Sequence, residues 1–310
     1  MARLTQQQAV GVKKESTYGT DAVLDGTNVI DIIDPKFDDI RETVKREILN
    51  SSLSMFQSIA GKGYADINCV VELKGSGSAG TAPEVGALLQ ACSMTETVDA
   101  GSSVVYTLNS ADDPASVTYE QDADGVLHQA LGARFSFDLG IVSGEMGKYT
   151  FKGQGLYATP IDATLPIKSG GDTTIPPLAE SCSLTIGGDT VEAREFNISL
   201  NNQLSFFESL NQSANIKEVR VVKREPSVSI KAEAVLEATK DWYTEMESAT
   251  QQAFSLQIGS SAGNIIIISG YLNVITIKQE DVDGIMYYQI EAELARNSSA
   301  GNDELQIIYK

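Results

Sequence analysis

Apolar and polar residues alternate with a period of two along much of this chain, which is the pattern of β-strands with one buried face. In residues 286–294 the even-numbered positions are apolar and the odd-numbered positions are mostly polar. Residues 265–268 are all isoleucine, and such a run predicts a strand that is covered on both sides. The chain is therefore expected to be mainly β.

Two short helices interrupt the predicted strands. Pro83 opens a segment that places Val85, Leu88, Leu89 and Cys92 on one helical face. Thr239 is the expected N-cap of a second segment, whose apolar stripe is Trp242, Tyr243, Met246 and Ala249.

One sequence pattern occurs twice. Residues 121–127 (QDADGVL) resemble residues 280–286 (EDVDGIM), and the offset between Asp124 and Asp283 is 283 − 124 = 159. Both Asp-Gly dipeptides fit tight hairpin turns, which require positive φ. A strand followed by a helix, a strand–turn–strand segment and an alternating segment with Phe37 or Phe196 recur at about this offset. We therefore expect an internal duplication.

A segment rich in proline and glycine separates the two copies. Residues 161–177 (IDATLPIKSGGDTTIPP) read as a linker. The expected organisation is a domain of residues 1–160, this linker and a second domain of residues 178–310. Each domain is predicted to be mainly β with one short helix. These two domains are called the first unit and the second unit below.

Composition and charge narrow the function classes. The chain has 310 residues, of which 42% are hydrophobic and 21% are charged, and no apolar run approaches the roughly 18 residues of a membrane span. The N-terminal residues MARLTQQQAVGVKKE lack the pattern of a secretory signal, so we expect no export and no membrane partner. The formal charge of −19 opposes non-specific binding to nucleic acid and keeps copies of the chain apart.

Candidate chemistry is sparse, and the sequence predicts no catalytic residue, no cofactor and no metal. His128 is the only histidine, and we interpret it as structural. Residues 122–125 start like a calcium loop, but the glycine comes too early, which favours a hairpin turn. Residues 75–80 (GSGSAG) lack the lysine of a phosphate loop. The cysteines are odd in number and far apart, so all three are expected to be small buried residues without a disulfide or zinc: Cys69, Cys92 and Cys182.

Carboxylates are numerous near the first predicted strands. Asp38, Asp39, Glu42 and Glu47 lie within ten residues of one another. They could form a solvated face or the lining of a channel, and the sequence leaves both open.

Four segments together resemble one protein family. Residues 13–20 (KKESTYGT) are similar to the N-terminal Lys-x-Glu-x-x-Tyr-Gly-Thr signature of the tail tube proteins of long-tailed bacteriophages. The same family is resembled, in the same order, by residues 71–80 (VELKGSGSAG), 82–93 (APEVGALLQACS) and 130–157 (ALGARFSFDLGIVSGEMGKYTFKGQGLY). The resemblance covers most of residues 10–157 and is weaker beyond the linker.

The resemblance implies a β-sandwich or barrel-like unit that packs six to a ring, with rings stacked into a hollow tube that guides DNA. The protein would then be a structural subunit of the virion tail, assembled in the host cytoplasm, and not an enzyme. Its partners would be other copies, the tape measure protein, tail tip and terminator proteins, and DNA only as a passenger. If both duplicated units fill ring positions, three chains form a pseudo-sixfold ring, which we favour; if one unit decorates the outside, six are needed.

Two further hypotheses concern function. An acidic lumen would ease the passage of DNA, because attraction to each phosphate would accumulate over a long tube. Residues 12–26 (VKKESTYGTDAVLDG) are polar and turn-rich and unlikely to pack alone, which suggests an arm that orders on assembly. Deleting residues 1–25 would then leave a folded monomer that forms no tubes.

Two rival interpretations remain at this point. Another β-rich polymeric, surface or adhesive module would fit the strands, but predicts an export signal. A carbohydrate-active β-sandwich enzyme should show paired carboxylates and exposed aromatic residues, and a single Trp gives it little support.

Overall fold

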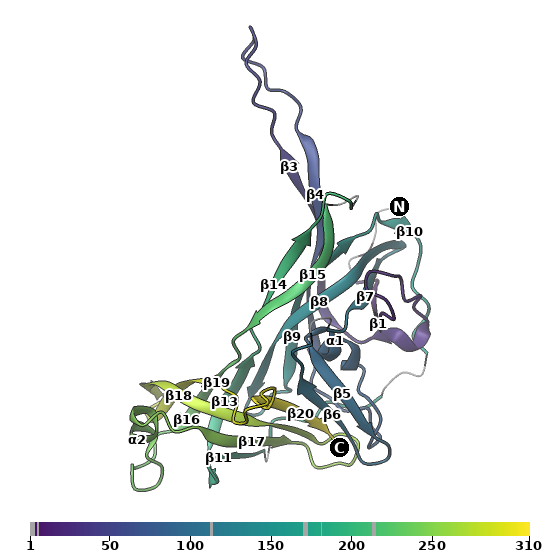
Figure 1. The fold of residues 1–310 in the computed structure, drawn as a ribbon. Helices are drawn as coiled ribbons and strands as arrows, with labels where there is room; N and C mark the ends of the chain where they lie inside the picture. The colour runs from purple at the N-terminus through teal and green to yellow at the C-terminus, as the bar shows by residue number, and fades with distance from the viewer. Residues whose placement is uncertain (1–3, 5, 112–113, 170–172, 181, 213–214) are drawn as a thin grey trace.

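The computed structural model describes residues 4, 6–111, 114–169, 173–180, 182–212 and 215–310, and the fold is mainly β, as predicted. A narrow hairpin rises from an upright body, and the second unit forms most of the base (Figure 1). The first unit and the segment after it contain β1 (Gln8–Lys14), η1 (Gly26–Asn28), β2 (Val29–Ile30), β3 (Ile33–Val44), β4 (Ile59–Glu72), α1 (Gly86–Ala91), β5 (Met94–Asp99), β6 (Ser103–Leu108), β7 (Val117–Ala123), β8 (Val126–Val142), β9 (Lys148–Tyr157) and β10 (Ile161–Asp162).

The second unit contains β11 (Ser183–Ile186), β12 (Asp189–Thr190), β13 (Ala193–Ser199), β14 (Asn202–Glu208), β15 (Ile216–Arg224), β16 (Ser227–Glu233), α2 (Trp242–Glu247), β17 (Gln252–Ile258), β18 (Ile266–Val282), β19 (Ile285–Leu294) and β20 (Leu305–Tyr309). Each unit thus has one short α-helix, as expected. The isoleucine run falls at the start of β18, where β17 and β20 pair with its two edges. Ile266 and Ile268 are fully buried, which confirms a covered strand.

The two units share one strand order, and all the pairings are antiparallel. The first unit has the order β2-β1-β7-β8-β9-β4-β3. The second unit has the order β12-β11-β17-β18-β19-β16-β13. The last strand before the second unit and the last strand of the second unit are also equivalent: β10 pairs with the start of β8, and β20 pairs with the start of β18. Each helix follows the corresponding strand, β4 or β16, and in the first unit the hairpin of β5 and β6 comes next, which has no counterpart in the second unit's order.

The duplication as predicted, with a single offset of 159 residues, is not confirmed. The offset does relate β3 to β13, where Phe37 and Phe196 fall, and it relates the strand before each helix. The two Asp-Gly turns, however, close hairpins that are not equivalent: β7–β8 in the first unit and β18–β19 in the second. Both turns have positive φ at Asp and Gly, because any tight hairpin of this type demands it. The similarity of residues 121–127 to residues 280–286 therefore reflects the requirements of the same turn type rather than equivalent positions in the two units.

The two units are joined by backbone pairing. Residues 195–199 of β13 pair with residues 138–142 of β8, and β20 pairs with β6. One buried cluster contains core residues from both units, including Phe137 and Ile198. The two units therefore share a continuous sheet and a continuous core.

The segment predicted as a linker packs along the first unit. β10 pairs with β8, and Leu165 is buried in a small cluster with Leu24 and Leu127. Lys168 forms ion pairs with Asp31 at 2.8 Å and with Glu84 at 2.7 Å. Residues 170–172 of this segment lie outside the described residues.

The expectation that residues 12–26 do not pack alone is wrong for residues 12–14, which end the strand formed by residues 8–14. This strand, β1, pairs with β7 along its whole length and with β2. Val10 is fully buried and Val12 is 3% exposed. Residues 9–12 are a short run of small and apolar residues among polar neighbours, and the burial of Val10 and Val12 stabilises the strand.

The helix α1 begins at Gly86 and buries the expected apolar face, with Leu88, Leu89 and Cys92 fully buried. The helix α2 begins at Trp242, and its N-cap is Asp241 rather than the predicted Thr239. The Asp241 carboxylate accepts a hydrogen bond from the Thr244 backbone N–H at 2.9 Å. A cap two residues nearer the helix can reach its free N–H groups, and Thr239 cannot. Trp242 is buried, whereas Ala249 is exposed.

Candidate assembly surfaces

Eight strands form one continuous sheet across the two units, in the order β3-β4-β9-β8-β13-β16-β19-β18. One face of this sheet is apolar. A row of directly paired residues, each at most 5% exposed, runs across seven of the strands: Val71, Tyr149, Leu139, Ile198, Val228, Ala292 and Val274. This face supplies the main core.

The opposite face of the sheet is polar, and we call it the polar face. The next row of paired residues is Val70, Thr150, Asp138, Ser199, Ser227, Glu293 and Asn273. Side chains alternate between faces in a strand, so each polar row lies beside a buried row. The face is hollowed around the junction of β8 with β13. One depression there, of about 400 Å³, includes Asp138, Lys148 and Asn197.

Carboxylates outnumber cations on the polar face, and two of its lysines form ion pairs with carboxylates of the same face. Lys152 lies 2.9 Å from Asp138, and Lys231 bridges Glu195 at 3.3 Å and Glu280 at 3.2 Å. The remaining carboxylates on this face include Asp66, Glu72, Glu291 and Glu293. Partial burial and the nearby Asp38 raise the pKa of Asp66. The surface therefore presents a net negative charge.

The outer end of the hairpin that β3 and β4 form projects from the body (Figure 1). Residues 33–72 are called the projecting hairpin below. Its loop, residues 45–58, has no regular secondary structure and exposes large apolar side chains. Leu49 and Leu53 are completely exposed, and Met55 is 84% exposed. Exposed apolar side chains gathered at the end of an extended hairpin make this loop a candidate contact surface.

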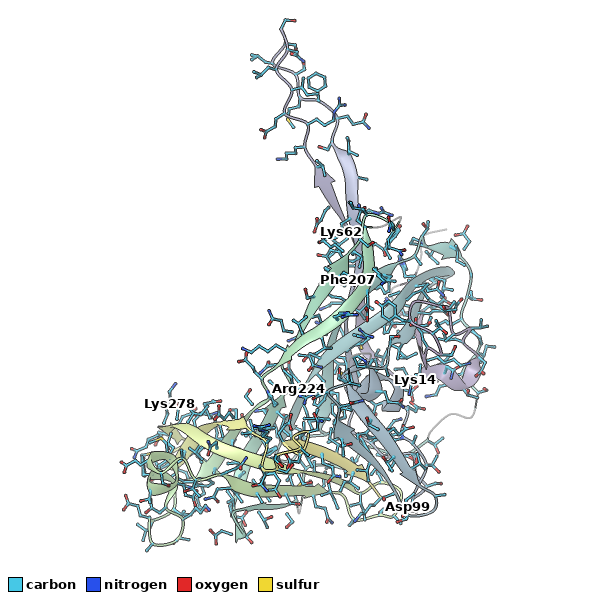
Figure 2. The ribbon with its side chains drawn as sticks, in the orientation of Figure 1. Lys14, Lys62, Asp99, Phe207, Arg224 and Lys278 are labelled. Carbon is cyan, nitrogen blue, oxygen red and sulfur yellow. The ribbon has the colours of Figure 1, made fainter. Side chains whose placement is uncertain are left out.

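The strands β14 and β15 form a second hairpin, which lies against the first unit. It is called the second-unit hairpin. Figure 2 shows Phe207 of this hairpin near Lys62 at the base of the projecting hairpin. The rings of Tyr64 and Phe206 have centroids 4.7 Å apart, and Lys62 lies 3.0 Å from Glu208. The second-unit hairpin is thus seated within the chain, whereas the projecting hairpin has a free end.

The N-terminal signature residues anchor this seat. Glu15 is buried, and its carboxylate accepts hydrogen bonds from the Gly19 and Gly132 backbone N–H groups and from the Ser116 hydroxyl, at 2.7–2.8 Å. The Tyr18 hydroxyl accepts a hydrogen bond from the Val219 backbone N–H at 2.7 Å. Burial raises the pKa of Tyr18 to about 12. The signature therefore fixes β15 of the second unit against the first unit.

Arg134 is completely buried beside this contact. It donates to Glu218 at 2.9 Å and to the Pro114 carbonyl at 2.9 Å, and its guanidinium lies 5.0 Å from the centre of the Tyr18 ring. Burial opposes ionisation of Glu218, but hydrogen bonds from Arg220 and Arg134 outweigh it and lower the pKa of that carboxyl. Sequence reasoning missed this pair, because its residues are 84 positions apart and neither lies in a motif.

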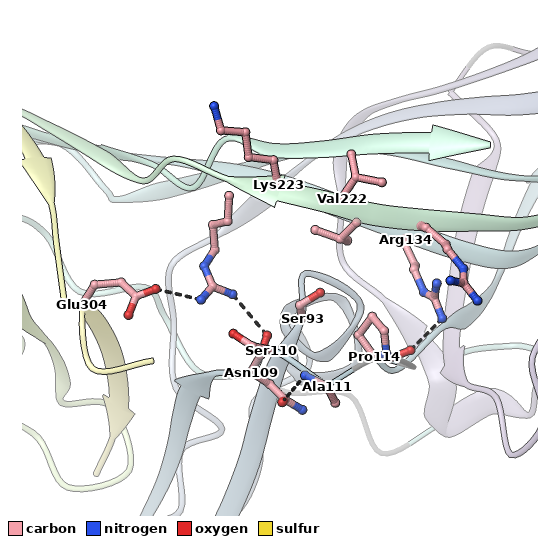
Figure 3. A pocket seen from close by; sticks show the side chains of 12 residues that line it. Ser93, Asn109, Ser110, Ala111, Pro114, Arg134, Val222, Lys223 and Glu304 are labelled. Carbon is pink, nitrogen blue, oxygen red and sulfur yellow. Dashed lines mark hydrogen bonds and ion pairs between the residues drawn. The ribbon is translucent and has the colours of Figure 1, made fainter. Parts of the chain in front are cut away.

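A polar cavity of about 520 Å³ lies between β15 and the loops that carry Asn109 and Pro114 (Figure 3). Arg224 crosses it, donating to the Asn109 carbonyl at 3.2 Å and to Glu304 at 2.7 Å. These contacts join the second-unit hairpin to loops of both units. The lining combines arginines and serines with Asn109 and Glu304, and it suits a structural junction.

The carboxylates near the first strands do not form one site. Asp38 lies opposite Asp66, whereas Asp39 is 3.2 Å from His128. Glu42 forms an ion pair with Lys62 at 3.1 Å, and Glu47 lies on the loop of the projecting hairpin.

His128 also contacts the Phe37 ring, with centroids 5.4 Å apart, which fits the structural role predicted for it. Residues 122–125 form a tight turn that ends β7, as predicted. Within the described ranges, no group of three or more His, Cys, Asp or Glu side chains is placed to hold a metal ion. No described helix has the length and apolar character needed to cross a membrane.

The cysteine prediction holds for two of three residues. Cys69 and Cys92 are fully buried, and burial raises the pKa of the Cys69 thiol to about 12. Cys182 is only half-buried, because it lies near the start of the second unit beside a surface depression. All three are free thiols.

These features, a two-faced sheet shared by both units and a projecting hairpin with an apolar end, suit a subunit that assembles with other copies. Residues 5–301 match the sequence family described as phage tail tube protein. This chain belongs to the phage tail tube protein family. The match covers nearly the whole chain, including the second unit, where the sequence resemblance was weak. No curated protein matches the chain.

Family membership establishes the general role. The chain is a structural subunit of a phage tail tube, its location is the virion tail, and the family is not one of enzymes. Self-assembly into a tube with other tail components follows from the same membership.

Proposed function

We propose that three copies of this chain close into a ring with six similar positions, and that rings stack into a hollow tube through which DNA is ejected. The observation that supports this best is the strand order that the two units share. The junction of β8 with β13 places one unit beside the other in a single sheet. A unit that repeats once within a chain can repeat around a ring, and closure of the sheet removes its exposed edges.

In this proposal the ring positions are filled by residues 1–160 and 178–310, and residues 161–177 connect them. A hexamer with one unit of each chain outside the wall remains the alternative. The shared strand order favours the trimer, because in a trimer both units occupy equivalent positions in the wall of the tube.

We place the polar face of the eight-stranded sheet toward the lumen. The apolar face is covered by the core, and the second-unit hairpin covers the polar face near Tyr64 and Arg134. The rest of the polar face is free to line a channel. Its excess of carboxylates would repel the phosphates of DNA, which carry a charge about every 1.7 Å of duplex.

The remaining contacts are those that a tail tube needs. The projecting hairpin would reach a neighbouring copy and bury its apolar end. Tape measure protein would occupy the lumen before DNA, and tail tip and terminator proteins would close the two ends. Assembly would take place in the host cytoplasm.

Electron microscopy and sedimentation of the concentrated protein, alone and with nucleating tail components, test the assembly. Hollow tubes are the expected result. Compact monomers under every condition, including in the presence of tail tip proteins, would contradict it.

The lumen assignment has its own test. Tubes carrying Asp66→Lys, Glu291→Lys and Glu293→Lys should form normally and slow or block genome ejection. A control with the same charge change at exposed sites away from the polar face is Asp99→Lys, Glu237→Lys and Glu247→Lys, which should eject normally. Equal ejection rates for both sets would rule out this face as the lumen.

A further inference from the structure

The internal junction of the two units has a defined register. In β8 and β13, Asp138 lies opposite Ser199, and Leu139 lies opposite Ile198. The ladder continues past β13, where the Leu200 backbone N–H donates to the Phe137 carbonyl at 3.0 Å. This part of β8 is free to accept β13 because β7 stops pairing at Ala133.

The corresponding edges at the two ends of the sheet have no partner strand in the described chain. β3, which corresponds to β13, pairs only with β4. β18, which corresponds to β8, pairs with β17 only as far as Leu272, and residues 273–282 pair on their other edge with β19. Figure 2 shows Lys278 at the outer end of the second-unit sheet, away from the first unit. One free edge is therefore the counterpart of β8 and the other is the counterpart of β13.

The two hairpins that carry this comparison match closely. Residues 130–140 of β8 pair with 148–157 of β9, and residues 272–282 of β18 pair with 285–294 of β19. The paired segments have the same lengths, and each ladder has one bulge near the same end. Asp138 therefore corresponds to Glu280.

The register can be carried across the sheet to β3. Gln154 of β9 lies opposite Asp66, which lies opposite Asp38. The matching residue of β19, Glu291, lies opposite Ser229, which lies opposite Asn197. Asp38 thus corresponds to Asn197, and Ile40 corresponds to Ser199.

We infer that the free edge of β18 binds β3 of a second copy of this chain, antiparallel, with Ile40 of one copy opposite Glu280 of the other. This seam rests on the proposed function and specifies its ring contact. It is head to tail, so each copy offers one edge of each kind, and the ring of the proposed function forms when the rotation between copies closes.

The side chains at the seam differ from those at the internal junction. Glu42 falls opposite Lys278, an attractive pair, whereas Asp39 falls opposite Asp281. The internal junction has Leu139 and Ile198 at the latter position. Like charges directly opposite one another destabilise paired strands. The seam between two isolated copies is therefore weaker than the internal junction, which agrees with a subunit that stays separate until a ring is nucleated.

Paired cysteines test the register. Assembled tubes of Ile40→Cys with Glu280→Cys, oxidised and separated under denaturing, non-reducing conditions, should give covalent species of two and more chains. The matched control is Asp138→Cys with Ser199→Cys at the internal junction, which should crosslink within single chains even in monomers. Each single variant shows what the native cysteines contribute.

The outcomes separate this inference from the proposed function. Tubes that form, with a positive internal control but only single chains from the Ile40 and Glu280 pair, would overturn the seam and leave the tail tube role intact. A wild-type chain that never forms tubes would instead count against the proposed assembly.

A second test applies if the cysteine pair does not assemble. Glu42→Lys and Lys278→Glu should each reduce tube formation, and the double variant should restore it. A double variant no better than the single ones would also overturn the register. Asp281→Asn keeps a side-chain oxygen for the Gly284 backbone N–H, which Asp281 now accepts at 3.3 Å, and should lower the protein concentration at which tubes appear.

Discussion

Each unit has a hairpin at the same point of the shared strand order, but the two hairpins differ in what they contact. The projecting hairpin consists of β3, β4 and the loop that joins them in the first unit. The second-unit hairpin is inserted between β13 and β16, the strands that correspond to β3 and β4. The first ends in free apolar side chains, whereas the second is held by Tyr18, Arg134 and Lys62 of the first unit. The second-unit hairpin is thus covered by the first unit of its own chain, whereas the end of the projecting hairpin is exposed and can be covered by another copy.

The largest effect is expected from removing the anchor of the second-unit hairpin. Deleting residues 1–25 removes β1, with its buried Val10 and Val12, and the Glu15 and Tyr18 contacts. We expect no cooperative unfolding transition in circular dichroism, because the core and the seat of the hairpin are both lost.

The matched control is the replacement of residues 45–58 by a short Gly-Ser turn. That change should leave the free energy of unfolding within about 0.5 kcal/mol of the wild type, because the loop is exposed, and should abolish tubes. A stable monomer after deletion of residues 1–25 would restore the interpretation of this segment as an arm.

A smaller loss is expected from the buried ion pair beneath the second-unit hairpin. Arg134→Met keeps much of the apolar volume but leaves Glu218 without its buried partner. Removing one member of such a pair costs about 3 kcal/mol. Chemical denaturation of the monomer measures it, with Lys223→Met, an exposed residue of the same strand as Glu218, as the control. An unchanged midpoint would show that the pair does not hold the hairpin.

The same pair predicts a pH dependence. The pKa of Glu218 is lower in the folded chain than its ordinary value, about 4.3 for glutamate. Its contribution to stability is therefore complete above that ordinary pKa and is lost as the pH falls through the lowered pKa. The difference in unfolding free energy between wild type and Glu218→Gln should shrink on acidification over this range. A difference that grows toward low pH would reverse the sign and contradict the assignment.

The smallest effect concerns the helix of the second unit. Asp241→Ala removes the N-cap of α2 and should destabilise the chain by about 1 kcal/mol. Thr239→Ala, at the position that the sequence alone suggested, should change little. Thermal unfolding of both variants decides between them, and a larger loss at Thr239 would refute the cap seen in the structure.

The sequence predicted several strands and both helices, but it did not predict how the strands pair. Periodicity located β19, the start of β18 and α1 closely, because local alternation and apolar spacing determine such elements. It could not assign the Asp-Gly hairpins to equivalent places, since their turns are alike in any tight hairpin. It also missed the packing of β1, the Arg134–Glu218 pair and Lys240, which is buried against Asp189 and Glu245. Those features depend on contacts between distant residues.

The most direct test is a map by electron cryomicroscopy of the assembled tube, resolved well enough to trace strands in cross-section. The account predicts three chains in each ring, with β3 of one copy continuing the sheet from β18 of the next and the polar face toward the lumen. Six chains in each ring, with the second unit outside the wall, would contradict it.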